Sequence, residues 1–362
     1  MGYINSIKTS MLVFPALAFL ITLPYMIVNY RKYGSVNVIR TLIVYSFVLY
    51  LLTIYLLVIL PLPEPGKIHT TYTAMLNLTP FSFVMDMIKS SPFTLTQPAT
   101  WLRALKHPTF YVPAFNIVMF IPFGIYLRYY FQCSFKKTVL FTALLSLFFE
   151  ITQLSGLYFI YPGPYRLGDI DDIIQNTAGG CIGYALGWFV MRLFPSREEI
   201  DRKSLQAGTR VSTIRITLSL VIDALIVAFF YALLKTPLPL WIFSALYFGM
   251  VPLWRGKTIG SSFLRFYMVF EQPRYIRTVL RGILLTGYFS IPSLLQLLAD
   301  GLEQSVDNLL SLCLFGSTVV LLILFLFTTM IIVLLNRRFF FDRISGTRYQ
   351  STVKNRRVDS QD

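Results

Sequence analysis

The sequence predicts an all-α integral membrane protein, a polytopic transmembrane helical bundle with about nine spans. Only 14% of its 362 residues are charged and 55% are hydrophobic, whereas a soluble domain carries roughly 25% charged residues. The mean hydropathy is +0.63. Several apolar runs approach the roughly 20 residues that cross the hydrocarbon core of a bilayer. We therefore expect a multi-pass protein of the cell membrane.

The first apolar run is interpreted as a retained helix rather than a signal peptide. It follows Lys8, it is long, and Arg31 and Lys32 come directly after it without an evident small-residue cleavage site. The remaining runs are separated by polar or proline-containing segments. The predicted spans cover residues 11–30, 40–60, 113–130, 138–157, 170–194, 214–234, 238–254, 278–299 and 309–335.

Two irregular stretches organise the chain. Residues 61–112 contain repeated prolines, which exclude a long helix there, although two short pieces, 81–90 and 99–106, suit amphipathic turns at the membrane interface. The polar stretch 195–212 divides five predicted helices from four. The predicted domains are 1–195 with an extracytoplasmic loop at 61–112, a cytoplasmic linker at 196–212, a four-helix domain at 213–350 and a polar cytoplasmic tail at 351–362.

Basic residues predict the orientation. Lys and Arg cluster in alternate connections, so the positive-inside rule places the N-terminus outside and the C-terminus inside. The net charge of +15 does not indicate nucleic acid binding, because these clusters lie between apolar runs, where anionic lipid head groups are their neighbours. Cys133, Cys181 and Cys313 show no metal-ligand spacing. We expect no metal and no cofactor.

Polar side chains gather in the predicted third, fourth and fifth spans. A charged group inside a bilayer costs roughly 2.5–3.5 kcal/mol on insertion scales, so it needs a partner or a wet cavity. Glu150 and Gln153 share one helix face, and Asp169 begins a stripe on the next span. In the predicted topology these groups lie toward the outer side. The candidate binding residues are Asn116, Glu150, Gln153, Arg166, Asp169, Asp172 and Asn176.

Two structural alternatives remain open for this cluster. Asp169 suits an N-cap of the fifth helix, where acidic residues also favour the macrodipole. Glu150 could pair with Arg166 for packing alone.

The predicted fifth helix has three glycines, among them Gly179 and Gly183, at a spacing of four residues, which allows helices to approach closely. We therefore expect this helix to be central.

Four ordered motifs carry a family resemblance. They are Asn77-Leu-Thr-Pro-Phe81, Asn116-Ile-Val-Met-Phe-Ile-Pro-Phe-Gly124, Glu150-Ile-Thr-Gln153 and Arg166…Asp169-Ile-Asp-Asp172-Ile-Ile-Gln-Asn176-Thr-Ala-Gly-Gly180. Together they resemble the VanZ family over roughly residues 10–195. The resemblance implies a bacterial membrane protein associated with resistance to teicoplanin and related glycopeptide or lipopeptide antibiotics. It also implies that the seven polar residues named above form the functional cluster.

The second half resembles an RDD domain over roughly residues 210–350. Arg215 and Asp223 fit the Arg and the first Asp of that family, at a spacing of eight where about seven is expected. Trp254-Arg-Gly-Lys257-Thr-Ile-Gly260 and Phe-Asp342-Arg343-Ile-Ser-Gly-Thr347 resemble two further segments. The resemblance predicts an Arg215–Asp223 charge pair. Some RDD proteins are linked to cation or proton exchange, but such a pair can also serve only to neutralise itself.

Three function hypotheses follow. The leading one is a non-enzymatic protein with no catalytic residues, which binds an amphiphile or lipid head group at the outer face. Its partners would be membrane lipids and a glycopeptide or lipopeptide antibiotic or a cell-wall lipid precursor. The first alternative is a cation- or proton-coupled transporter that uses intramembrane carboxylates. The second is a lipid-modifying membrane enzyme, in which paired carboxylates act as acid and base.

Overall fold

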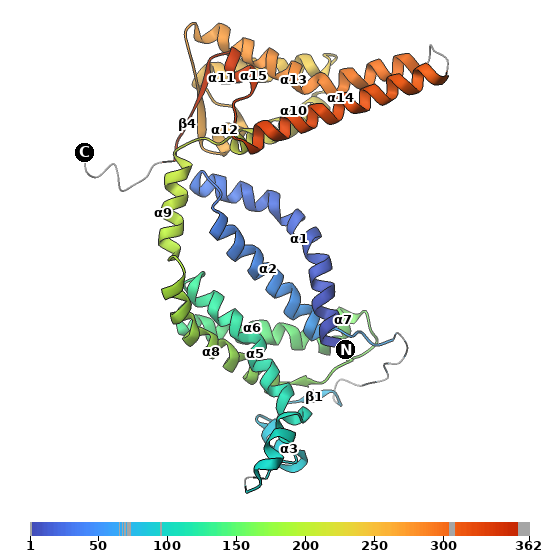
Figure 1. The fold of residues 1–362 in the computed structure, drawn as a ribbon, viewed down its shortest axis with the longest axis vertical. Coiled ribbons are helices and arrows are strands. Elements are labelled where there is room, and N and C mark those ends of the chain that lie inside the picture. The colour runs from blue at the N-terminus through green and yellow to red at the C-terminus, as the bar shows by residue number, and fades with distance from the viewer. Residues whose placement is uncertain are drawn as a thin grey trace, which may run out of the picture. The chain divides into compact units, whose positions relative to one another are not determined.

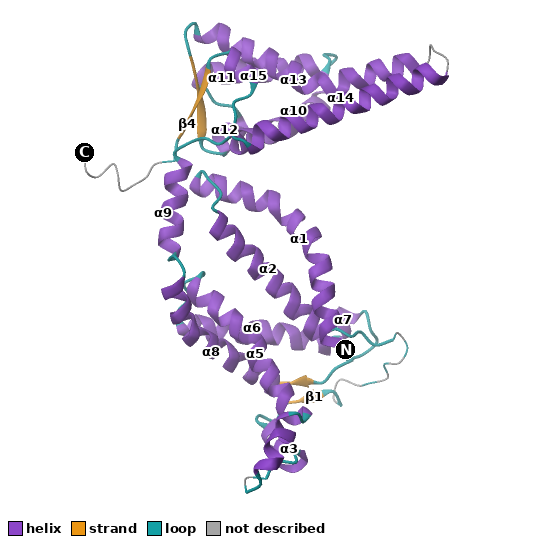
Figure 2. Cartoon of the chain, viewed as in Figure 1, coloured by secondary structure: helices purple, strands orange, loops and turns teal. Residues whose placement is uncertain are grey.

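The computed structural model describes residues 2–64, 66, 68, 70, 74–94, 96–303 and 308–353. Helices account for most of this part of the chain, as Figure 2 shows. The predicted tail from residue 354 onward lies outside the described residues. By its internal contacts the chain divides into two compact units. The first consists of Met1–Ile21 and Val38–Ile200, and the second of Thr22–Asn37 and Asp201–Asp362.

The first unit takes its long helices from the apolar runs. Between α2 and α5 the described part of the proline-containing stretch includes two short helices, α3 and α4, close to the predicted pieces. The elements are α1 (Gly2–Tyr33, which continues into the second unit), α2 (Val38–Ile59), β1 (Leu76–Asn77), α3 (Ser82–Ser90), α4 (Pro98–Leu105), α5 (Pro108–Tyr129), α6 (Phe135–Leu154), α7 (Gly156–Phe159), β2 (Gly168–Asp169) and α8 (Ile170–Leu193).

The second unit begins with the end of α1 and contains the segment predicted as a linker, most of which is helical. Its further elements are α9 (Arg197–Gly208, whose first residues belong to the first unit), α10 (Thr213–Leu234), α11 (Leu240–Arg255), α12 (Ile259–Phe263), β3 (Phe266–Phe270), α13 (Arg274–Glu303), α14 (Asn308–Leu334), α15 (Phe340–Ile344) and β4 (Thr347–Ser351) (Figure 1).

Seven helices of the described residues are long and apolar enough to cross a membrane. They are α1, α2, α5, α6, α10, α13 and α14, so the protein is a polytopic membrane protein. The prediction of about nine spans differs at two helices. The amides and glycines of α8 lower its hydropathy, and α11 has only 16 residues.

Two short sheets depart from the all-α prediction, so the described chain is mostly helical rather than purely so. In the first unit β1 pairs with β2 in parallel, with Leu76 opposite Gly168 and Asn77 opposite Asp169. In the second unit β3 pairs with β4 in antiparallel register over five residues of each strand. Such short strands lack the repeated alternation that identifies a strand in sequence.

The helices α5 and α8 make the most extensive contact of the described elements and lie side by side in Figure 1. Glycines allow their backbones to touch. A Cβ atom on Gly183 would lie 2.0 Å from Ile121 O, and one on Gly179 would lie 2.1 Å from Ile117 O. The expected central position of this helix is consistent with these contacts, since α6 packs on α8 as well. Small residues are what permit this approach in a bilayer.

The contact between α5 and α8 predicts a strong effect of Gly183→Ala. The added methyl group cannot fit against Ile121 O, so the helices must separate, and we expect the free energy of unfolding to fall by about 1–3 kcal/mol. The measurement is thermal unfolding of the purified protein in detergent. Gly316→Ala is the matched control, because a Cβ there meets nothing within 4 Å. Equal melting temperatures for the two variants would contradict the contact.

Candidate functional site

The parallel pairing of β1 with β2 joins two of the sequence motifs. It places Asn77 opposite Asp169, at the point where the chain enters α8. The Asn77 amide Nδ2 donates to Asp169 Oδ1 at 3.2 Å and to Ser82 Oγ at 2.9 Å. The loop that precedes α5 is therefore fixed against the acidic start of α8 by both backbone and side chains.

Asp171 acts as the N-cap of a helix to which it does not belong. The helix α3 begins after Phe81, whose backbone is left-handed with φ of 63°. Asp171 accepts hydrogen bonds from Phe81 N at 2.5 Å, Phe83 N at 3.0 Å and Ser82 Oγ at 2.7 Å. The two backbone amides are among the donors that a helix N-terminus leaves unpaired. Only 1% of Asp171 is exposed, so its carboxylate is fully used in holding the loop.

Glu150, Asp169 and Asp172 form the open part of the acidic cluster. Glu150 Oε2 accepts from Asp169 N at 3.0 Å, and Asp169 Oδ1 in turn accepts from Asp171 N at 2.9 Å. The expected capping role of Asp169 is thus present alongside its contact with the loop. Within the described chain, Glu150 Oε1, Asp169 Oδ2 and Asp172 Oδ2 accept no hydrogen bond. Each of the three carboxylates keeps one oxygen available.

Next to the carboxylates, amide side chains form further hydrogen bonds between α5, α6 and α8. Asn116 Nδ2 donates to Asp172 Oδ1 at 2.7 Å and to Gln175 Oε1 at 3.0 Å. Asn176 Nδ2 donates to Ser146 Oγ at 2.9 Å. The Asn176 Oδ1 atom is buried and has no hydrogen-bond partner. A polar column therefore runs inward from the acids along the surface that the glycines bring together.

The last two predicted residues of the first unit converge on one carbonyl. Gln153 Nε2 donates to Val58 O at 2.7 Å, and an Arg166 guanidinium nitrogen donates to the same oxygen at 2.6 Å. Among the described residues Arg166 forms no ion pair with Glu150. Both side chains fasten the end of α2 to the cluster.

All seven residues proposed from the sequence for this unit lie in or beside one cluster, although Gln153 and Arg166 bond to Val58 rather than to the carboxylates. Sequence reasoning did not assign roles to Ser146, Asp171 or Gln175. Only Asp171 carried a signal, since it lies inside the Asp169-Ile-Asp-Asp172 string, and Asn77 was named only as the start of a family motif.

The comparison with protein families agrees with this geometry. The family described as VanZ/LLP1 matches residues 47–192, a range that contains the whole cluster. Residues 47–192 form a VanZ/LLP1 domain. No curated protein and no solved structure matches the chain.

The charge pair predicted for the second unit is not present, which corrects that prediction. Arg215 and Asp223 are both fully buried on α10, but each bonds to other groups. Arg215 is paired entirely with uncharged oxygens instead of a carboxylate. Its acceptors are the carbonyls of Gly34 at 3.1 Å, Gly208 at 3.0 Å, Leu264 at 2.9 Å and Arg265 at 2.8 Å, and the hydroxyl of Ser351 at 3.3 Å.

Asp223 is held by neutral donors from α11 and α12. It accepts from Tyr247 Oη at 2.7 Å, from Thr258 Oγ1 at 2.6 Å and from Gly260 N at 2.7 Å. Thr258 also caps α12, and a Cβ on Gly260 would lie 2.3 Å from Ser219 O. The Trp254–Gly260 segment therefore forms a close-fitting cradle around one carboxylate.

A buried ion pair of the second unit joins residues that the sequence did not pair. Arg281 Nε lies 2.8 Å from Asp342 Oδ1, and Tyr349 Oη donates to the same oxygen at 2.7 Å. Burial raises the pKa of Tyr349 above its ordinary value, with Asp342 acting in the same direction and Arg281 against it. The phenol thus stays a donor, and the group joins α13, α15 and β4.

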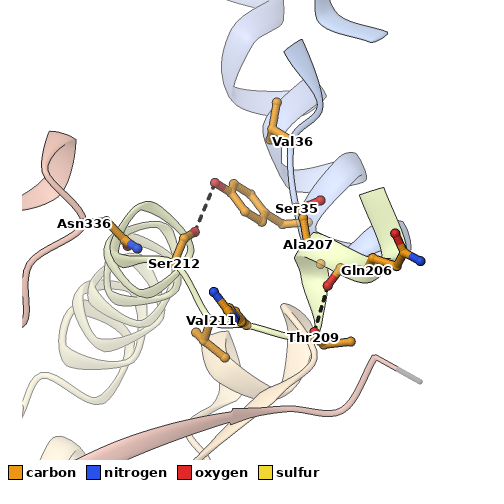
Figure 3. A pocket seen from close by; sticks show the side chains of 11 residues that line it. Ser35, Val36, Gln206, Ala207, Thr209, Val211, Ser212 and Asn336 are labelled. Atoms are coloured by element: carbon orange, nitrogen blue, oxygen red, sulfur yellow. Dashed lines mark hydrogen bonds between the residues drawn. The ribbon is translucent and has the colours of Figure 1, made fainter. Parts of the chain in front are cut away.

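A hollow of about 550 Å³ opens in the second unit beside the start of α10 (Figure 3). Several of its polar groups are already paired. Tyr30 Oη lies 3.4 Å from Ser212 Oγ, Thr209 Oγ1 donates to Gln206 O at 2.8 Å, and Asn336 Oδ1 accepts from a backbone amide of α10. These contacts join connecting segments of the second unit.

The capping contact predicts that Asp171→Ala loosens the loop of the VanZ/LLP1 domain. Three donors at the start of α3 lose their acceptor, and we expect a local cost of about 2 kcal/mol. Hydrogen exchange of residues 76–90 should accelerate about thirtyfold. Asp86→Ala is the control, because Asp86 is exposed on the same helix and should leave exchange unchanged. Unaltered exchange in Asp171→Ala would show that the cap does not hold the loop.

The cradle around Asp223 predicts a stability effect for Asp223→Asn. An amide cannot accept all the hydrogen bonds of the carboxylate, so unfolding should become easier by about 2 kcal/mol. Glu271→Gln serves as the comparison, because Glu271 forms only half-exposed ion pairs with Arg277 and Arg348, worth at most about 1 kcal/mol. Thermal unfolding in detergent measures both. A smaller shift for Asp223→Asn than for Glu271→Gln would contradict the cradle.

Proposed function

We propose that the VanZ/LLP1 domain binds an amphiphile or lipid head group that carries a cationic group. The observation that carries this proposal is the set of open oxygens on Glu150, Asp169 and Asp172. Each carboxylate is anchored through its other oxygen or its backbone, so the three remaining oxygens need no rearrangement to accept a ligand. Preorganised acceptors of this kind lower the ordering cost of binding.

The charge balance supports a cationic ligand. Carboxylates that share a partly buried site repel one another, and an approaching cation relieves that repulsion. Arg166 is the nearby base, but its guanidinium is exposed and bonds to Val58 O. No group of three or more His, Cys, Asp and Glu side chains in the described ranges is arranged to hold a metal ion. An organic ammonium group, which tolerates looser geometry, suits the open oxygens better.

The proposed sidedness connects the site with antibiotics. The distribution of Lys and Arg places the acids toward the outer surface, where glycopeptide and lipopeptide antibiotics act. Residues 47–192 carry the family match, and the resemblance to VanZ implies an association with teicoplanin resistance. We therefore propose that the ligand is such an antibiotic or a cell-wall lipid precursor, and that the protein acts by binding rather than by catalysis.

For the second unit we propose an RDD-like domain with a structural use of its charged residues. The support is the fit of Arg215, Asp223 and the Trp254–Gly260 segment to the expected pattern. Because Arg215 is surrounded by carbonyls and Asp223 by neutral donors, neither has a free atom with which to bind a transported ion. No observation on this unit favours the transporter over the binding protein.

The test is teicoplanin susceptibility of a deletion strain complemented with the intact protein or with single variants. Glu150→Gln and Asp172→Asn remove charge but keep shape, so each should weaken binding about tenfold, the equivalent of about 1.4 kcal/mol, and restore susceptibility. Binding of teicoplanin to the purified variants should fall in parallel.

Asp86→Asn is the control, because it removes an exposed carboxylate of the same domain outside the cluster. Membrane abundance of every variant is checked by immunoblotting. Full protection by both Glu150→Gln and Asp172→Asn, at normal abundance, would remove the acidic cluster from the function.

A further inference from the structure

A lateral groove of about 940 Å³ lies on the second unit between α10, α11 and α13. Its walls are apolar, with hydroxyls as the polar side-chain groups, and no charged side chain lines it. Mostly apolar concavities of this size with a few polar groups are characteristic of small-molecule sites. The helices that form it include two membrane-spanning candidates, α10 and α13.

The groove arises where α11 crosses α13. A Cβ on Gly282 would lie 2.5 Å from Gly249 N, so the two backbones touch at this point. The groove is confined to one side of the crossing, because its lining residues precede Gly249 on α11 and follow Gly282 on α13. There Gly287 faces open space, since a Cβ on it would meet nothing within 4 Å.

Thr286 provides an independent sign of an occupant. Its side chain lines the groove, the residue is only 8% exposed, and its Oγ1 atom has no hydrogen-bond partner. Hydroxyls in helices usually donate to the carbonyl four residues earlier, and Thr278 and Ser290 do so on this helix. An unpaired hydroxyl in apolar surroundings is unfavourable, and a turn of this side chain toward the groove would let it donate to an acceptor there.

The depth of Thr286 is compatible with a lipid ester. The 16 residues of α11 extend about 24 Å, less than the roughly 30 Å hydrocarbon core. We take the polar level of the bilayer to reach the start of α11 at Leu240, because a tryptophan follows it. Along α11, Leu240 lies nine residues from the crossing, and along α13 Thr286 lies four residues from it. The difference along the helix axis puts the Thr286 hydroxyl about 8 Å below the start of α11. Trp241 lines the groove at that end, as tryptophan does at membrane interfaces.

We propose that this groove is a binding site for one membrane phospholipid. One acyl chain lies in the groove past Gly287, and an ester carbonyl accepts the hydrogen bond of Thr286. Lipid tails gain no hydrophobic energy from a protein surface in a bilayer. Retention therefore depends on the shape of the groove and on this hydrogen bond. The absence of charged lining residues places the charged head group outside the groove. This site is independent of the acidic cluster.

The experiment uses the full-length protein in nanodiscs of phosphatidylcholine that contain a phosphatidylcholine with a diazirine in its acyl chain. After illumination, mass spectrometry should locate the label on the groove segments 217–228, 240–248 and 283–297. Gly287→Leu should lower this labelling about tenfold, because the leucine side chain occupies the space of the acyl chain. Gly316→Leu is the matched control with equally open surroundings on α14 and should label as the unaltered protein does.

A second variant tests the hydrogen bond. Thr286→Val keeps the shape of the groove, and native mass spectrometry after detergent exchange should show about fivefold less retained phospholipid. Labelling spread evenly over all helices, or unchanged labelling in Gly287→Leu, would overturn the site. Crosslinking of two chains through these segments would instead assign the groove to a second copy. Unchanged retention in Thr286→Val would overturn the ester contact.

Discussion

The approach of α5 and α8 to backbone contact is the constraint on which the first unit depends. Asn116 is a short side chain, and it reaches both Asp172 and Gln175 on the facing helix only because the glycines let the two helices touch. From the other side α6 brings Ser146 and Glu150 to the same column. If α5 and α8 were separated by ordinary side chains, the amides of one helix could not satisfy the acids of the other, and the cluster would be too costly to hold in a bilayer.

Seven of the nine predicted spans agree with the structure, because a bilayer imposes length and hydropathy on each of them. The predicted 113–130 corresponds to Pro108–Tyr129, and the predicted 81–90 to Ser82–Ser90. The site residues of the first unit could be found for a related reason. A carboxylate within an apolar run, such as Glu150, stands out against its surroundings and requires a partner. The spacing of the glycines on α8 similarly indicated a crowded helix before its neighbours were known.

What the sequence could not show is which partner each charge takes. Arg215 and Asp223 are on one helix eight residues apart, and opposite signs predicted a pair. The actual partners are carbonyls and amides of distant segments, among them Gly208 and Gly260. Backbone groups carry no sequence signature, because every residue except proline has the same donor and acceptor. The same argument applies to Asp171, whose partners are the amides of Phe81 and Phe83.

Some buried charges of the protein are fully paired, whereas others keep an open atom. The nitrogen atoms of Arg215 all donate to backbone carbonyls or a hydroxyl, so this side chain stabilises the fold and needs no further hydrogen-bond partner. In the VanZ/LLP1 domain Asp171 is satisfied in the same manner, yet its neighbours Asp169 and Asp172 each leave an oxygen open. Asp171 holds the loop at α3, and Asp169 holds the same loop through Asn77. Asn77 bonds to Oδ1 of Asp169 and leaves Oδ2 open, so the proposed ligand and the loop would use different oxygens of a single carboxylate.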